Sequence, residues 1–63
     1  PSMRLSIILE ITRIGNAQKV TAIDEISGTE VSFIAPVNAP RSEIDRLARA
    51  KLIYVINKKS ADS

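Results

Sequence analysis

Hydrophobic and polar residues alternate along the first part of the chain, with the two-residue period of strands that bury one face. The clearest run begins at Leu5 and ends at Ile11, and only Ile8 breaks the alternation. Two further runs of strand-forming residues follow, and Pro36 ends the last of them because proline cannot donate a backbone hydrogen bond. The pattern predicts three strands, at about residues 4–13, 18–24 and 29–35.

The Gly15-Asn16 dipeptide predicts a tight hairpin between the first two strands, because both residues tolerate the positive φ angles of two-residue turns. This turn, with a second turn at residues 25–28, sets the register of all three strands. One face of the resulting sheet is entirely apolar, since the register pairs Leu9 with Ala22 and Val31, and Ile11 with Val20 and Phe33. A slip by one residue would scatter these side chains to both faces, so the hydrophobic pattern and the turn favour the same antiparallel meander.

The period changes to that of a helix after Pro40. The apolar stripe consists of Ile44, Leu47, Ala48, Leu52, Val55 and Ile56. Pro40 and a capping box of Ser42 and Asp45 mark its start, and Lys51 lies within the stripe, where its stem can pack while its ammonium reaches water. We expect a helix at about residues 40–57, with residues 52–56 as a short fourth strand as the alternative, and a disordered tail at 58–63.

The predicted fold class is therefore α+β, a three-stranded antiparallel meander packed against one C-terminal helix (β-β-β-α). The chain has 63 residues, which form one small domain at 1–63, because so short a chain supports only one core. Its 44% hydrophobic and 25% charged residues are typical of a globular protein. Cysteine is absent and no export signal or membrane span is visible, so we expect a cytoplasmic protein without a membrane partner.

The sequence contains few residues of the types that usually carry out catalysis. Histidine and cysteine are both absent, and the only glycines, Gly15 and Gly28, cannot form a phosphate-binding loop. The adjacent carboxylates Asp24 and Glu25 could bind Mg²⁺ or share a proton, but acidic residues are common where a strand enters a turn. We expect no catalytic, cofactor-binding or metal-binding residues, no cofactor and no small-molecule substrate.

Positive charge collects in the C-terminal part of the chain. Residues 41–59 contain six basic and two acidic residues, against three basic and four acidic residues before them. The candidate nucleic-acid contacts are Arg41, Arg46, Arg49, Lys58 and Lys59. A solvated helix explains the same pattern, because its dipole favours acidic residues at the start and basic residues at the end. Aromatic residues that could stack on bases are limited to Phe33 and Tyr54, so nucleic acid ranks second as a partner.

Protein association is the favoured function. The register pairs Ile8 with Ile23 on the sheet face away from the helix, with Ile34 near one end of that face. Ile53 is expected on the helix side opposite the apolar stripe, as a second exposed apolar site. The sheet edges also leave backbone groups that could pair with another chain. The predicted function is a small non-catalytic interaction or accessory domain, with a protein partner or a homodimer.

Several short motifs resemble a known family. They are residues 14–17 (Ile-Gly-Asn-Ala), 19–24, 28–32, Leu47-Ala48 and Lys51-Leu52. Together they resemble a family of short uncharacterised alphaproteobacterial proteins, some of which carry an automatic label of serine hydroxymethyltransferase. That enzyme needs a large pyridoxal-phosphate fold, which a chain of this size does not supply. The resemblance implies a bacterial cytoplasmic origin, no assigned activity and no functional residues to transfer.

Overall fold

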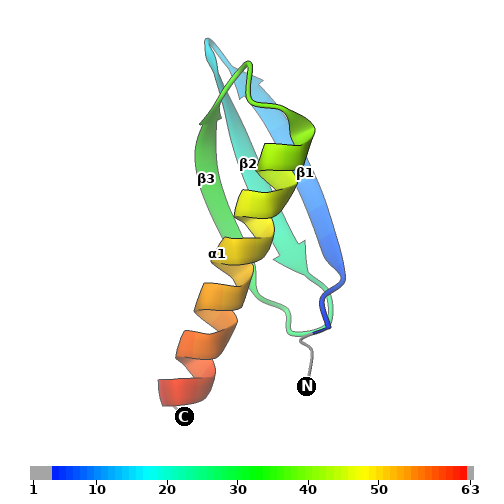
Figure 1. Cartoon of the computed structure of the whole chain (residues 1–63), viewed down its shortest axis with the longest axis vertical. Coiled ribbons are helices and arrows are strands. Elements are labelled where there is room, and N and C mark those ends of the chain that lie inside the picture. The colour runs from blue at the N-terminus through cyan, green and yellow to red at the C-terminus, as the bar shows by residue number, and fades with distance from the viewer. Residues whose placement is uncertain (1–3, 63) are drawn as a thin grey trace.

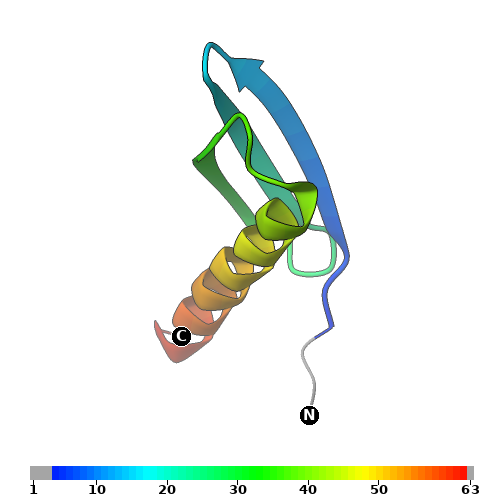
Figure 2. The same cartoon turned by 45° about the horizontal axis from the view of Figure 1, so that its top comes forward.

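A computed structural model describes residues 4–62, and it confirms the β-β-β-α architecture (Figures 1 and 2). The elements are β1 (Ile7–Ile14), β2 (Ala17–Asp24), β3 (Glu30–Pro36) and α1 (Arg41–Asp62). The three strands form one antiparallel sheet in the order β1-β2-β3, and α1 crosses one face of it. β1 and β3 are therefore both edge strands.

The predicted register is confirmed at every pair of the apolar face. Leu9 lies opposite Ala22, which lies opposite Val31, and Ile11 lies opposite Val20, which lies opposite Phe33. The hairpin turn differs in one detail: Gly15 has a φ of 59°, whereas no residue other than glycine has a positive φ in the part of the chain that the structure describes. A positive φ at the first central residue alone is typical of a type II′ turn, so the hairpin depends on Gly15 and not on Asn16.

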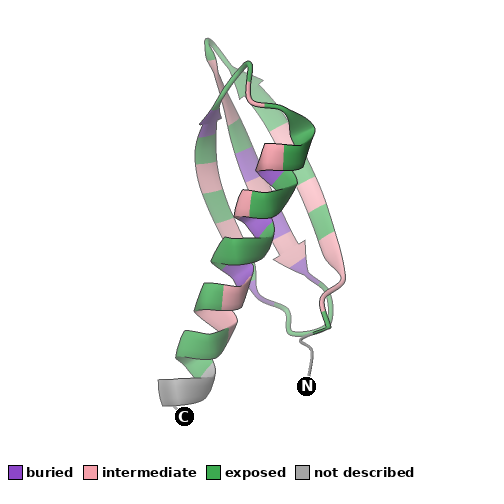
Figure 3. Ribbon diagram, in the orientation of Figure 1, coloured by how far each residue is buried: buried purple, intermediate pink, exposed green. Residues whose placement is uncertain are grey.

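The core lies between α1 and the apolar face of the sheet (Figure 3). One cluster joins Val20 and Ala35 to Ile44, and a second joins Ala22 to Ala48 and Leu52. Alanine occupies three of these six positions, which lets the helix backbone approach the strands closely. The predicted stripe is confirmed for Ile44, Ala48 and Leu52, which are buried, while Leu47, Val55 and Ile56 are only half-buried.

The predicted limits of the helix need three corrections. The alternative of a fourth strand at residues 52–56 is wrong, because this segment is helical. The helix also continues beyond residue 57 to Asp62, so the predicted disordered tail is helical up to that residue, and residue 63 lies outside the described residues. No glycine or proline interrupts residues 41–62, and Lys59 in the last turn suits the helix dipole. Instead of the capping box, Asp45 accepts a 2.9 Å hydrogen bond from Arg41 Nε.

The C-terminal half of α1 extends past the end of the sheet (Figures 1 and 2). Leu52 is the last buried residue of the helix up to Lys59. Contact with the strands thus concentrates in the first three turns of a helix that is 22 residues long. The tight part of the core is correspondingly small.

Candidate functional site

The Asp24 carboxylate organises the loop between β2 and β3. Asp24 is 1% exposed. Its Oδ2 accepts hydrogen bonds from Ser27 Oγ at 2.7 Å and from the Ser27 amide at 3.0 Å, while its Oδ1 accepts one from the Ser6 amide at 2.8 Å. These bonds tie the loop to the segment before β1. The side chains described, at residues 4–59, contain no cluster of three metal-ligating groups, and the bonds of Asp24 give it the role of a turn residue.

These bonds make the stability of the domain sensitive to acid. The Ser27 hydroxyl, followed by the Ser6 amide, lowers the pKa of Asp24 from 3.8 to about 2. Because the folded state has the lower pKa, the stabilisation is complete above about pH 4 and is lost as the pH falls towards 2. We expect the unfolding free energy of the wild type to fall across this window, and the fall to be smaller in Asp24→Asn. Denaturant titrations at several pH values measure both slopes.

Ser27→Ala is the companion variant for this prediction. It removes the largest cause of the lowered pKa while leaving the carboxylate in place. Its acid-induced loss of stability should therefore be smaller than in the wild type and should be complete at a higher pH, because the folded pKa lies closer to the unfolded one. Equal acid slopes in the wild type and in Asp24→Asn would contradict the role assigned to this carboxylate.

The candidate nucleic-acid contacts do not form one uniform basic surface. Arg41 pairs with Asp45, and Arg46 pairs with Glu43, which raises the pKa of Arg46 and lowers that of Glu43. Arg49, Lys58 and Lys59 are exposed and lie outside the two ion pairs found among the described side chains of residues 4–59. Positions 49 and 58 are half a turn apart around the helix axis, so these cations spread around α1.

The predicted isoleucine surface is only partly brought together. Ile8 pairs with Ile23 on the open sheet face, and Ile8 is 48% exposed. Ile34 lies two rungs away, beside Lys19, and is 64% exposed. The polar rung between them contains Glu10, Thr21 and Ser32, and the hydroxyls of Thr21 and Ser32 are 3.2 Å apart. The prediction for Ile53 needs correction, because that side chain is half-buried and the exposed aromatic of this segment is Tyr54.

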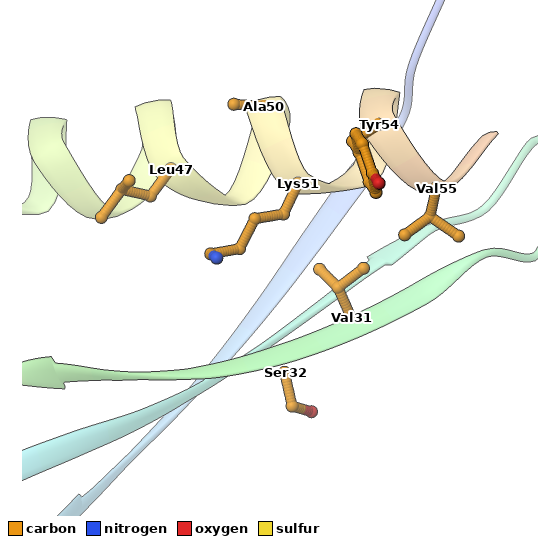
Figure 4. Close-up of a pocket in the computed structure, with 7 residues that line it drawn as sticks. All are labelled: Val31, Ser32, Leu47, Ala50, Lys51, Tyr54 and Val55. Atoms are coloured by element: carbon orange, nitrogen blue, oxygen red, sulfur yellow. The ribbon is translucent and has the colours of Figure 1, made fainter. Parts of the chain in front are cut away.

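An open groove of about 480 Å³ runs between β3 and α1 (Figure 4). Its lining is mostly apolar and comprises Val31, Ser32, Leu47, Ala50, Lys51, Tyr54 and Val55. Val31 points from the strand towards the helix, and Lys51 reaches from the helix towards the strand. Tyr54 is 66% exposed at one end. The groove therefore has a mostly apolar lining with one positively charged side chain, Lys51.

Lys51 is the charged residue of this groove. Its Nζ lies 5.5 Å from the centroid of the Phe33 ring, a distance at which an ammonium is attracted to an aromatic face. The Lys51 side chain is exposed at the position within the apolar stripe that the sequence predicts for it. Both ion pairs of α1 that the structure describes leave Lys51 out, so its ammonium is available to an anionic group.

The free edge of β3 runs beside the groove. Three backbone hydrogen bonds show towards which neighbouring strand the amide and carbonyl groups of each residue point. They are Asp24 N–H to Thr29 C=O at 2.8 Å, Val37 N–H to Asn16 C=O at 3.2 Å, and Glu25 N–H to Ser6 C=O at 2.9 Å. In an antiparallel ladder the bonding direction alternates along each strand. Val31, Phe33 and Ala35 therefore bond towards β2. The backbone groups of Glu30, Ser32 and Ile34 point away from the sheet.

Sequence reasoning missed this groove. It placed Val31 and Leu47 in the core and treated Tyr54 only as a scarce aromatic. The spacing of Leu47, Lys51 and Tyr54 puts all three on one side of a helix, and this was the available signal. The sequence does not show where α1 crosses the sheet. This crossing position brings the helix side that carries Leu47, Lys51 and Tyr54 next to β3 and leaves that side partly uncovered.

Comparisons with known proteins place the chain in a family. In residues 4–62 no helix has the length and apolar character needed to cross a membrane. No curated protein and no solved structure matches the chain. A family model described as a domain of unknown function (DUF6898) matches residues 5–59. The match spans the three strands and α1 as far as Lys59, and the resemblance to an uncharacterised family is to that extent confirmed. The chain therefore belongs to the DUF6898 family.

Proposed function

We propose that this protein is a non-catalytic interaction domain that binds another polypeptide in the groove between β3 and α1. The observation that carries the proposal is the position of an open strand edge beside an apolar groove with an exposed tyrosine. An edge strand offers backbone hydrogen bonds, and the groove offers side-chain contacts. Tyrosine is enriched among the residues that dominate binding energy at protein interfaces.

The groove suits a polypeptide better than the open sheet face does. On the open face a polar rung separates Ile34 from Ile8 and Ile23, so no continuous apolar surface forms there. In the groove, Val31, Leu47 and Val55 lie together with Tyr54 around one hollow. A side chain that binds there would contact apolar groups of both β3 and α1, which favours burial of apolar area.

Selection of short random peptides on the immobilised wild-type domain tests this function. We expect enriched peptides whose affinity falls roughly tenfold or more in Tyr54→Ala, because this change removes the exposed aromatic of the groove. The control is Ile8→Thr, which alters an exposed apolar residue of the open sheet face. Binding that survives Tyr54→Ala but is lost in Ile8→Thr would move the site to the isoleucine surface, and a selection without enrichment would overturn the proposal.

Nucleic-acid binding through Arg41, Arg46, Arg49, Lys58 and Lys59 is the alternative function. Arg41 and Arg46 are already paired with carboxylates, so binding phosphates would compete with these pairs. Titration with DNA and RNA at low and high salt separates the two functions. Strongly salt-dependent binding to nucleic acid, together with failure of the peptide selection, would favour the alternative.

The cellular setting belongs to the same proposal. The chain has no cysteine, which suits the reducing interior of a cell. We propose that it acts in the bacterial cytoplasm as an accessory protein, without a cofactor or a small-molecule substrate. Fractionation of the native host, followed by detection with an antibody against the domain, would locate the protein directly.

A further inference from the structure

We infer that the occupant of the groove is an extended acidic peptide segment that adds a fourth strand to the free edge of β3 and places a carboxylate against Lys51. This inference rests on the proposed function and identifies the chemistry of the partner. It follows from the direction of the β3 backbone, from the geometry of an added strand and from the charge of the groove.

The backbone of β3 is arranged to receive a strand. Glu30, Ser32 and Ile34 direct their amide and carbonyl groups away from β2, in the plane of the sheet. A strand bonded there would gain main-chain hydrogen bonds, which are the source of affinity when a peptide extends a sheet. The open side of the groove lies along this same edge, so the added strand would also close the groove.

The added strand would present alternate side chains to the two faces of the sheet. A residue opposite Ser32 would point to the open face, as Ser32 does in Figure 4. Its two neighbours would point to the face of Val31, below α1. There they would meet Leu47, Lys51 and Tyr54. The geometry thus calls for apolar and acidic side chains on the groove side of the segment.

Charge decides between an acidic segment and a second copy of this chain. Lys51 is the only charged residue that lines the groove, and it lies outside the ion pairs of the described chain. Two copies joined edge to edge about a twofold axis near Ser32 would bring their Lys51 ammonium groups towards each other. Like charges in such a position oppose association, whereas a carboxylate would be attracted.

The decisive experiment uses the tightest-binding peptide that the selection recovers. We expect an acidic sequence of alternating pattern whose binding slows hydrogen exchange at the Ser32 and Ile34 amides in the wild-type domain. Lys51→Gln should weaken binding roughly fivefold, the effect of one exposed charge pair. Arg49→Gln is the matched control, since it removes one unpaired positive charge from the other side of the same helix.

The outcomes separate this inference from the proposed function. Peptides that depend on Tyr54 but are basic or neutral, or that leave exchange at Ser32 and Ile34 unchanged, would overturn the acidic strand and keep the interaction domain. Equal weakening by Lys51→Gln and Arg49→Gln would also overturn it, because the charge effect would then be general. Failure of every peptide to bind would overturn both. Dimerisation of the domain through protected Ser32 and Ile34 amides would instead identify a second copy as the occupant.

Discussion

Leu52→Ala should destabilise the domain by about 2–5 kcal/mol, because it leaves a cavity at a fully buried position of the core. Leu52 packs with Ala48 and Ala22, and it is the last buried residue of the helix within the part, up to Lys59, whose burial is described. A domain of 63 residues has a total stability of roughly 3–9 kcal/mol. The variant should therefore lose a large fraction of the stability of the domain and unfold at a clearly lower temperature and denaturant concentration than the wild type. Circular dichroism during thermal and denaturant unfolding measures this loss.

Tyr54→Ala is the control for this variant. It also truncates a large side chain of α1, two residues further along, but at a position that is 66% exposed. Its unfolding free energy should stay within about 0.5 kcal/mol of the wild type, as for most surface substitutions. Similar destabilisation by both changes would show that the core does not end where the structure places it.

Ala48→Leu should destabilise the domain by about 1–3 kcal/mol, by overpacking instead of by a cavity. Ala48 is fully buried opposite the sheet, next to Ala22, which is also fully buried. A leucine at this position would push the helix away from β2 or force strained side-chain rotamers. Denaturant unfolding gives the free energy. The strand amides would show any displacement of the helix by nuclear magnetic resonance.

Ala50→Leu is the matched control for this second prediction. It introduces the same side chain into the same helix, at an exposed position in the lining of the groove. Leucine is nearly as good a helix former as alanine, so stability should change by less than about 0.5 kcal/mol. If Ala48→Leu were as stable as Ala50→Leu, there would be room for a leucine between α1 and the sheet. The close packing of Ala48 against Ala22 would then be wrong.

The fold could be predicted from the sequence because its signals are local and agree with one another. The alternation around Leu9 and Ile11 and the position of Gly15 fix one register, and a slip would expose the apolar face. The end of α1 was harder to predict, because residues 52–56 are rich in strand formers. Tertiary contact decides this segment: Leu52 is held in the core as part of a continuous helix.

The candidate site was predicted less well than the fold, for a physical reason. Sequence periodicity tells which side chains share a face, but not how far a helix covers the sheet beneath it. α1 leaves the free edge of β3 open, and this creates the groove that Lys51 and Tyr54 line. The isoleucines of the open face were assigned to the correct side. The polar rung of Thr21 and Ser32 interrupts them, because neighbouring strands contribute their residues in fixed rows.

The overhang of α1 has a consequence for the motions of the protein. Beyond Leu52 the helix has only half-buried and exposed residues up to Lys59, so its last turns can open while the rest of the domain stays folded. The protection of backbone amides from hydrogen exchange should fall steadily along the helix after this residue, because the side chains beyond it are less buried. A molecule that binds these last turns would hold them in place, and a force on them would reach the sheet through the packed turn that contains Ala48 and Leu52.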